Sequence, residues 1–593
     1  MKHLITTIAI GFGLPMSLLG AQGIDAVRVN NIGYLTDDIK AAVLMLQDPS
    51  SPVGNIMIVD NNGNKFRPDS IVSKASWQPM GATYRIYFTS LTTPGSYRVI
   101  SPTASSPEFK IGDEIYRGAN EIPLRYMRQQ RCGYNPSLDA CCHQHDGYIV
   151  ICDSLEGRHI DVTGGWHDAS DYLQYLTTSA NAVYQMLWAY RENPTVWADT
   201  YDADGRPGAN GIPDILDEAR WGLEWMLKMN PHEGLYFNQI ADDRDHRYAG
   251  LPAGDNVDYG WGPGNGRPVY PCSGKPYGLM DNKNRSRGLA SSVGKFASSF
   301  GLGAILFKDH DPEFAALLSD RSAKAYEIAA ANPGACQTAP CASPYFYEED
   351  NWVDDMELAA VTRHLLTGDI SLKRDAVNYG RMEPVTPWMG ADSARHYQWY
   401  PFVNLGHVLL SRDADPKVAR EFTANMRSGL ARILDRAGNN AFVSGVPYIW
   451  CSNNLTVALV TQAMLYRDIT GDTRYQELET AARDWLFGAN PWGKCMIVGL
   501  PSSGDYPRDP HSALTNLEGI EVTGGLVDGP VYAGIFNSLR GVHLRNKDRY
   551  APYQNSTVVY HDDYHDYSTN EPTMDGTASL SYMLGRLASC ASK

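Results

Sequence analysis

Two aspartates in the segment Gly164–Tyr172 have the residue type and the spacing for acid–base chemistry. The segment reads Gly-Gly-Trp-His-Asp-Ala-Ser-Asp-Tyr, so Asp168 and Asp171 lie three residues apart on a turn that two glycines open. Two carboxylates at this spacing could hold and deprotonate a water molecule. Most Asp-x-x-Asp pairs cap helices or lie in solvated turns, so both interpretations remain open.

A third carboxylate, Glu571, lies near the C-terminus in the segment Asp566–Pro572. Ser568 and Glu571 have the spacing of a capping box, which would give the glutamate a structural role at the start of the last helix. The same side chain could instead project from the helix start into a cleft. An acid that faces a distant carboxylate is the arrangement that glycoside hydrolysis with inversion requires.

Two cysteines and two histidines form a possible metal set. Cys132, the adjacent Cys142 and His143, and His167 together offer two thiolates and two imidazoles. A closed Cys₂His₂ set is typical of structural zinc, because it leaves no open position for water. The alternative is that these cysteines form disulfides, as Cys336 and Cys341 could also do in an oxidising compartment.

Several other side chains could bind sugar or calcium. His511 could hydrogen-bond to a sugar hydroxyl, although a lone histidine is more often packed. The rings of Trp352, Trp450 and Tyr567 are candidates for sugar stacking, although flat amphipathic rings suit cores equally well. The remaining candidates are three acids that could gather oxygens around Ca²⁺ or cap the helix that begins there: Asp350, Asp354 and Asp355.

Composition excludes several classes of protein. The chain has 593 residues, 43% of them hydrophobic, so a sizeable core is available. The net charge of −16 and the lack of a Lys/Arg run argue against nucleic-acid binding. No organic cofactor is expected.

The first 21 residues have the pattern of a signal peptide. Lys2 and His3 precede an apolar stretch, and small residues follow at Gly20 and Ala21. No later apolar run approaches the ~18 residues of a membrane span. We therefore expect an exported protein without a membrane span, either periplasmic or secreted.

Two kinds of secondary structure follow in order. Residues 24–112 contain short strand candidates separated by turn signals such as Asn61-Asn62-Gly63, which predicts a β-sandwich. From residue 116 to 593 the pattern is helical, with apolar residues at helical spacing. The expected helices cover 178–191, 213–229, 290–307, 313–331, 355–367, 417–434, 455–468, 474–487 and 574–587. Many helices of similar length suit a closed ring of helical hairpins.

These segments together resemble glycoside hydrolase family 9, in the subgroup with an N-terminal immunoglobulin-like domain. Val27–Tyr34 resembles the first strand of that domain, and Gly211–Arg220 resembles a catalytic-domain helix of the family. The Gly164–Asp171 segment and Asn570-Glu571 match its two active-site signatures in the expected order.

The resemblance implies an (α/α)₆ barrel and hydrolysis of β-1,4-glucan with inversion. It implies that Asp171 is the general base, that Asp168 helps to hold the water, and that Glu571 is the general acid. On this interpretation the paired aspartates stay ionised on an exposed turn while Glu571 keeps its proton. The resemblance also maps zinc onto the Cys₂His₂ set and calcium onto the region of Asp350, Asp354 and Asp355.

One position departs from the family pattern. The family carries an Arg two positions after its substrate-contacting His, whereas Ala513 follows His511 here. Arg508 lies on the other side of His511 and could substitute for it. The departure favours a soluble or branched glucan over plain cellulose.

The leading hypothesis is therefore an exported endo-β-1,4-glucanase. An exo-acting β-glucosidase or glucosaminidase of the same family is the alternative. A non-catalytic glycan-binding protein is a third, which the presence of Asp168, Asp171 and Glu571 disfavours.

Overall fold

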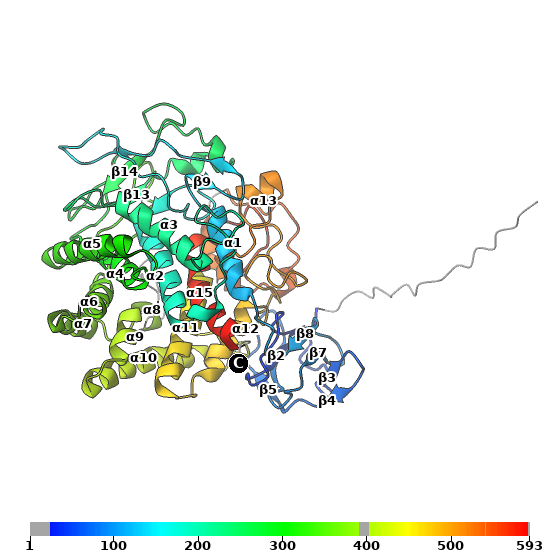
Figure 1. Ribbon diagram of the computed structural model, residues 1–593. Coiled ribbons are helices and arrows are strands. Elements are labelled where there is room, and N and C mark those ends of the chain that lie inside the picture. The colour runs from blue at the N-terminus through cyan, green and yellow to red at the C-terminus, as the bar shows by residue number, and fades with distance from the viewer. Residues whose placement is uncertain (1–23, 391–402, 540, 591–593) are drawn as a thin grey trace, which may run out of the picture.

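Two four-stranded antiparallel sheets build the N-terminal part of the computed structural model, which describes residues 24–390, 403–539 and 541–590 (Figure 1). The predicted signal peptide lies outside the described residues. One sheet has the order β1-β2-β6-β5, formed by Ala26–Arg28, Ala41–Leu46, Ala82–Tyr87 and Ser70–Lys74. The other has the order β4-β3-β7-β8, formed by Lys65–Phe66, Met57–Asp60, Gly95–Ile100 and Phe109–Ile111.

The two sheets share one apolar core. In β7, Tyr97 and Val99 are buried while Arg98 and Ile100 are exposed, as expected for a strand with one face on the core. The buried ring of Tyr34 makes edge contacts with rings from the same core, those of Phe88 and Phe109. The predicted β-sandwich is confirmed.

A closed inner ring of helices follows within the described residues. Its members are α2 (Leu176–Glu192), α4 (Ala290–Leu306), α6 (Val353–Thr367), α9 (Leu405–Ser411), α11 (Ser452–Thr470) and α15 (Met574–Cys590). Each helix contacts the next, and α15 returns to contact α2. These helices are buried over most of their length, because they have neighbours on every side.

An outer helix packs against each inner one (Figure 1). The outer helices are α1 (Ile122–Gln129), α3 (Asp214–Lys228), α5 (Pro312–Ala331), α7 (Ile370–Met382), α10 (Pro416–Ala437) and α12 (Gln476–Leu486). They are amphipathic: α10 buries Phe422, Met426, Leu430 and Ile433 at helical spacing. The predicted (α/α)₆ barrel is confirmed.

Glycines allow close helix packing and end two of the helices. A Cβ atom on Gly303 of α4 would lie 2.9 Å from Leu318 Cδ1 on α5, so a larger residue there would have to displace the leucine side chain. Gly368 and Gly471 adopt left-handed φ angles of 74° and 69° after α6 and α11. These are the glycine caps that the Thr-Gly-Asp pattern at both sites favours.

Short strands bring distant loops together beside the barrel. β12 (Gln174–Tyr175) joins a four-stranded sheet with β13 (Phe237–Ile240), β14 (Pro268–Pro271) and β11 (Tyr148–Ile149). β15 (Leu526–Val527) pairs with β18 (Pro572–Thr573). The second pairing places the backbones of Asp528 and Glu571 side by side, because the Asp528 N–H donates to the Glu571 carbonyl at 2.9 Å.

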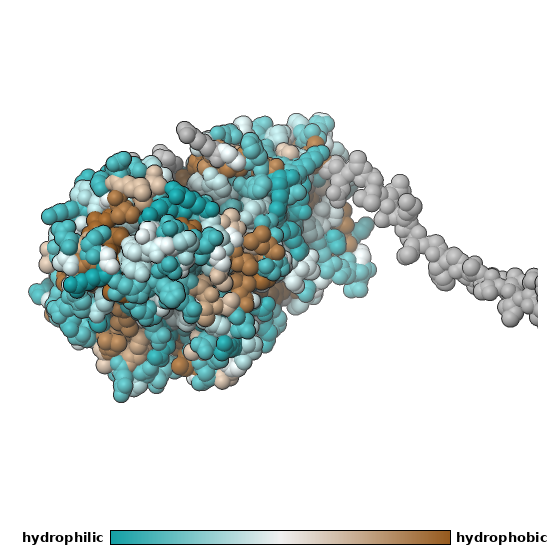
Figure 2. All heavy atoms as spheres, turned by 90° about the horizontal axis from the view of Figure 1, so that it is seen from above, coloured by the Kyte–Doolittle hydropathy of each residue, from teal (hydrophilic) through white to brown (hydrophobic). Residues whose placement is uncertain are grey.

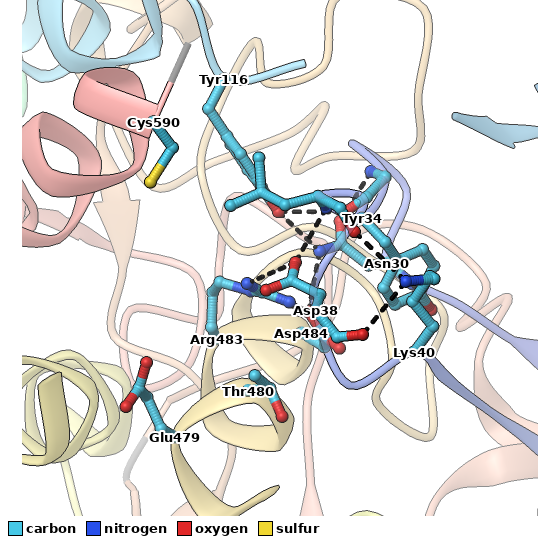
Figure 3. Close-up of polar contacts among 12 residues, drawn as sticks. Asn30, Tyr34, Asp38, Lys40, Tyr116, Glu479, Thr480, Arg483, Asp484 and Cys590 are labelled. Carbon is cyan, nitrogen blue, oxygen red and sulfur yellow. Dashed lines mark hydrogen bonds and ion pairs between the residues drawn. The ribbon is translucent and has the colours of Figure 1, made fainter. Parts of the chain in front are cut away.

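A buried polar network joins the β-sandwich to the barrel (Figure 3). Arg483 on α12 donates to Asp38 at 2.9 Å and to Asp484 at 2.7 Å. Asn30 donates to Asp484 at 2.8 Å and to the Tyr116 hydroxyl at 2.9 Å. The sandwich and the barrel are therefore held by charged and polar contacts that are closed to solvent.

On the face seen in Figure 2, hydrophobic residues form separate patches among hydrophilic ones. None of the helices in the described ranges combines the length and the apolar character of a membrane-spanning segment.

Candidate active site

A cleft of about 590 Å³ contains all three predicted catalytic carboxylates. Its walls come from loops that lie far apart in the sequence. The lining residues are mainly acids, histidines and aromatic rings, including Asp168, Asp171, His246, Tyr248, Tyr345, Tyr347, Trp450, His511, Asp528, Tyr564, Tyr567, Glu571 and Asp575.

The turn before Asp168 depends on glycine and on a buried tryptophan. Gly165 has φ 70°, and a Cβ there would lie 2.7 Å from the ring of Trp225. The fully buried Trp166 donates from Nε1 to Glu218 at 2.8 Å. The loop that carries both aspartates is thus fixed against α3.

Asp168 is buried and holds two hydroxyl groups. Its Oδ1 accepts from Thr178 at 2.6 Å, and its Oδ2 accepts from the Tyr347 hydroxyl. Burial, together with the charges of Asp171 and Asp575, raises the pKa of Asp168 well above its usual value. Asp168 is 7% exposed, so the expectation that both aspartates lie on an exposed turn is wrong for Asp168.

Asp171 is the more accessible aspartate, with a side chain that is 15% exposed. Its Oδ2 lies 3.5 Å from His246 Nε2, and its Oδ1 accepts from the Leu173 N–H at 3.2 Å. Burial alone would lower the pKa of His246, but the hydrogen bond and the charge of Asp171 outweigh it and raise that pKa to about 9. A histidinium therefore faces Asp171 at neutral pH.

Glu571 faces the aspartate loop. Its Oε1 accepts from the Ser170 N–H at 3.0 Å and from the Ser170 hydroxyl. The capping-box alternative is wrong, because Ser568 bonds instead to Asp566 at 2.7 Å and the last helix begins at Met574. Burial, opposed by His511 and reinforced by the charge of Asp171, raises the pKa of Glu571.

Asp528 is an acid in the cleft wall that sequence reasoning missed. It is fully buried, and its Oδ1 accepts from the Cys451 thiol at 3.0 Å. Burial and the charge of Glu571 raise its pKa well above the usual value. No local motif marks this residue, because its place depends on the pairing of β15 with β18.

Aromatic rings form the wall beside Glu571. The rings of Trp450 and Tyr567 lie 5.8 Å apart, and that of His511 lies 5.9 Å from Tyr567. These three candidates for sugar binding line the cleft. Trp352 is not among the lining residues: its ring packs against Tyr379 at 5.9 Å.

Arg508 does not replace the missing arginine. Its guanidinium lies 3.5 Å above the Tyr506 ring and donates to the Gly504 carbonyl at 3.0 Å, outside the cleft. Ala513 lines the cleft in its place. His511 is held by its own N–H, which donates to the Asn570 carbonyl at 2.9 Å, and by a bond from Nδ1 to the Tyr564 carbonyl.

The two cysteines and two histidines converge into a possible metal site. The ligand atoms of Cys132, Cys142, His143 and His167 all lie within 4.8 Å of one another. Cys132 Sγ is 3.6 Å from His143 Nδ1, Cys142 Sγ is 3.8 Å from His167 Nε2, and the two histidine nitrogens are 3.3 Å apart. His143 Nε2 also lies 3.1 Å from Asp255 Oδ2, which orients the ring. All ten cysteines are free thiols, so the disulfide alternative has no support.

The three aspartates of the predicted calcium site do not gather into one group of ligand atoms in the described residues. Asp354 and Asp355 are buried, and Lys295 Nζ lies 3.0 Å from Asp355 and also pairs with Glu349. The lysine ammonium thus pairs with Asp355 and Glu349, whereas Asp354 Oδ1 is buried without a hydrogen-bond partner among the described residues. Asp350 is exposed, and within the described ranges the three aspartates make no group that could hold a metal ion.

Comparison with known proteins identifies the family. The sequence model for "Glycosyl hydrolase family 9" matches residues 116–584, and that for "Cellulase N-terminal ig-like domain" matches residues 23–106. The chain belongs to glycosyl hydrolase family 9. It is therefore a glycoside hydrolase of the cellulase type.

Similar proteins carry related names. Endoglucanase C of Cellulomonas fimi is 25% identical over 95% of this chain, which spans 52% of that longer protein. The cellodextrinase of Butyrivibrio fibrisolvens is 24% identical, with 94% of this chain and 98% of that protein aligned. The crystal structure of a metagenome-derived family 9 endoglucanase superposes with a TM-score of 0.73 at 25% identity, over 95% of this chain and 99% of that one.

His246 gives a testable pH dependence. Replacing it with Asn removes the positive charge beside Asp171, so we expect the acidic limb of the kcat/KM profile to move up by about half a pH unit.

Because the folded-state pKa of His246 is raised from 6.5 to about 9, its contribution to stability is present below pH 6.5 and lost as pH rises through 9. The melting-temperature difference between the two proteins should shrink over that range. His310→Asn on an exposed loop is the matched control; an unmoved acidic limb would contradict the ion pair.

Proposed function

We propose that this chain is an exported, inverting endo-β-1,4-glucanase that acts on soluble or branched β-glucan. The observation that carries the proposal is the convergence of Asp168, Asp171 and Glu571 on one cleft with aromatic walls. Family membership supports the chemistry, and the names of the endoglucanase and cellodextrinase relatives support a β-1,4-glucan substrate.

Asp171 acts as the general base in this mechanism. It is the less buried of the two aspartates, and its Oδ2 lies 3.5 Å from Nε2 of His246. Asp168 orients the water, because its side chain is buried and its oxygens are already fixed by Thr178 and Tyr347.

Glu571 acts as the general acid. Burial raises its pKa, which favours the protonated carboxyl that a general acid needs to protonate the leaving oxygen. Ser170 bonds to Oε1 only, which leaves Oε2 for the substrate.

The cleft walls suit a glucan chain. Trp450, Tyr567 and His511 offer flat rings and a hydrogen-bonding nitrogen to one side of the sugar. Ala513 leaves room where the family has an arginine, which is the basis for proposing a soluble or branched substrate. The pattern at residues 1–21 supports export.

The product pattern tests the proposal directly. Incubation with a soluble β-1,4-glucan should release a ladder of oligosaccharides in the first minutes. Glucose or glucosamine as the sole early product would replace the endo assignment with an exo-acting one. Binding without release of reducing ends would contradict any hydrolase function.

The stereochemistry of the product tests the carboxylate roles. If Asp171 activates water on the face opposite Glu571, the new anomeric hydroxyl must be inverted. Proton NMR of the earliest products from a β-linked substrate should show the α-anomer before mutarotation. An initial β-anomer would mean retention, and Asp171 could not then be the base.

Structural zinc is the second part of the proposal. Bonds of about 2.0–2.1 Å to nitrogen and 2.3 Å to sulfur in a tetrahedron set N···N at ~3.3 Å and S···N at ~3.5 Å. The separations of 3.3, 3.6 and 3.8 Å fit this geometry. Zinc held by Cys132, Cys142, His143 and His167 would cross-link the segments that carry these residues. Its role would be structural, because four protein ligands leave no position for a catalytic water.

Removal of one ligand should therefore loosen the enzyme without abolishing its chemistry. We expect purified protein to contain about one zinc per chain by elemental analysis, and Cys142→Ser to lose that zinc and melt at a lower temperature. Activity should fall only through displacement of the adjacent Asp168 loop. Cys152→Ser, outside the metal set, should retain zinc and stability. Wild-type protein without zinc would contradict the site.

A further inference from the structure

Arg267 is a buried arginine between the metal set and the loop that carries the two aspartates. It precedes β14, and only 2% of its surface is exposed. Neither the metal set nor the proposed acid–base chemistry uses it. Its guanidinium nonetheless contacts Cys132 of the metal set and the backbone carbonyl of Tyr172, next to Asp171.

Every nitrogen of the Arg267 guanidinium has a partner. Nε and Nη2 form a two-pronged pair with Asp146 at 3.1 and 2.8 Å. Nη2 also lies 3.6 Å from Cys132 Sγ and donates to Gln174 Oε1 at 2.7 Å. Nη1 donates to the carbonyl of Tyr172, the residue that directly follows Asp171.

These contacts hold both ends of the aspartate loop. The Tyr172 carbonyl lies next to Asp171, at the far end of the loop. Gln174 carries the link to the near end, because its Nε2 donates to the Gly164 carbonyl at 2.7 Å. One guanidinium therefore connects Gly164 and Tyr172, between which Asp168 and Asp171 lie.

The same guanidinium is tied to the metal set. Cys132 supplies one sulfur, and Asp146 belongs to the segment that begins with Cys142 and His143, since the Asp146 N–H donates to the His143 carbonyl at 3.4 Å. The Arg267 N–H also donates to Asp146 Oδ1 at 3.2 Å. A shift of the segment that contains Cys132 or of the one that contains Cys142 would therefore move the aspartate loop, because the rigid guanidinium of Arg267 contacts all three.

We propose that Arg267 is a positioning residue that couples the metal set to the aspartate loop. It fixes the loop that holds the water-activating carboxylates and at the same time holds Cys132 from outside the set. This inference rests on the proposed function for its catalytic part. A lysine could not replace it, because a single ammonium cannot reach Asp146, Gln174, Tyr172 and Cys132 in one plane.

The first test is Arg267→Lys, which keeps the positive charge but loses the planar guanidinium and its several N–H donors. We expect kcat on a soluble β-glucan to fall by ~10–100-fold while KM changes less than ~3-fold, because the reacting carboxylates move and the sugar-binding rings do not. Zinc affinity, measured by competition with a chelator, should fall by ~10–100-fold, as for other groups that orient metal ligands. Arg467→Lys, which breaks a two-pronged pair with Glu479 between α11 and α12, is the matched control and should change neither quantity.

A double cycle then tests the coupling itself. Removal of zinc from the wild type should lower kcat, but removal from Arg267→Lys should lower it little further, because both changes release the same loop. Independent, multiplying effects would overturn the inference, as would wild-type kcat and zinc affinity in Arg267→Lys. If the wild type hydrolyses no β-glucan, the proposed function fails, while the zinc-affinity measurement still tests the link to Cys132.

A second variant covers the case in which Arg267→Lys does not fold. Gln174→Met removes only the link from Arg267 to Gly164. The contacts of Arg267 with Asp146 and with Cys132 remain. We expect its zinc affinity to stay within ~3-fold of the wild type while kcat falls by ~10-fold. A wild-type kcat in this variant would overturn the inference that Arg267 fixes the position of the aspartate loop.

Discussion

Glu571→Gln is expected to reduce hydrolysis of unactivated β-glucan by about 10²–10⁴-fold, because general acid catalysis contributes about that factor. The amide keeps the size of the side chain and can still accept from Ser170, so the fold and oligosaccharide binding should be largely unchanged. Steady-state kinetics and isothermal titration with a cello-oligosaccharide measure the two effects separately.

The leaving group makes this test specific for proton donation. An aryl β-glycoside with an acidic phenol needs little protonation, so Glu571→Gln should retain far more of its activity on that substrate than on glucan. Glu518→Gln, on an exposed part of α13 (Ala513–Glu518), is the matched control. A uniform loss on both substrates would indicate a role other than that of general acid.

The long helices could be predicted from sequence because their local signals agree. The expected helix over 290–307 is observed at Ala290–Leu306, and the one over 313–331 at Pro312–Ala331. Each has a continuous apolar pattern, and α5 also has an Asp311 cap that accepts from the Phe314 N–H.

Shorter or more polar helices were missed. α9 has only seven residues, Leu405–Ser411, and α1 has eight with a proline near its start. α7 is mostly polar and buries only Leu372, Ala376, Val377 and Gly380. These helices are stabilised mainly by packing against the barrel, which no local pattern reports.

The residues of the active site also divide into those that the sequence predicted and those that it did not. Asp168, Asp171 and Glu571 lie in short motifs, whereas His246 and Asp528 do not. His246 lies in the short 3-10 helix Asp245–Arg247, and the position of Asp528 depends on the long-range pairing of β15 with β18. The surroundings of the predicted calcium ligands also depend on a distant residue: Lys295, about 60 residues before Asp355, pairs with that carboxylate. Trp352 failed because its type suits a sugar face and a core equally well.

Arg483→Met is expected to destabilise the whole protein by about 3–5 kcal/mol, since it removes the cation from a buried ion network. Arg483 is 2% exposed and pairs with Asp38 of the sandwich and Asp484 of α12. Without it, two carboxylates remain buried at the junction of the sandwich and the barrel. Denaturant titration of the full chain measures the loss.

The pH dependence separates this mechanism from a simple packing defect. Carboxyl groups left without their cation take up protons as the pH falls, so the stability deficit of Arg483→Met should be largest near pH 7 and smaller near pH 4. Arg381→Met breaks a two-pronged pair with Glu421 in which the arginine is 54% exposed, and it should cost no more than about 1 kcal/mol at either pH. A deficit in Arg483→Met that is equally large at both pH values would assign the loss to packing around α12, and the charged network would then not be what holds the sandwich to the barrel.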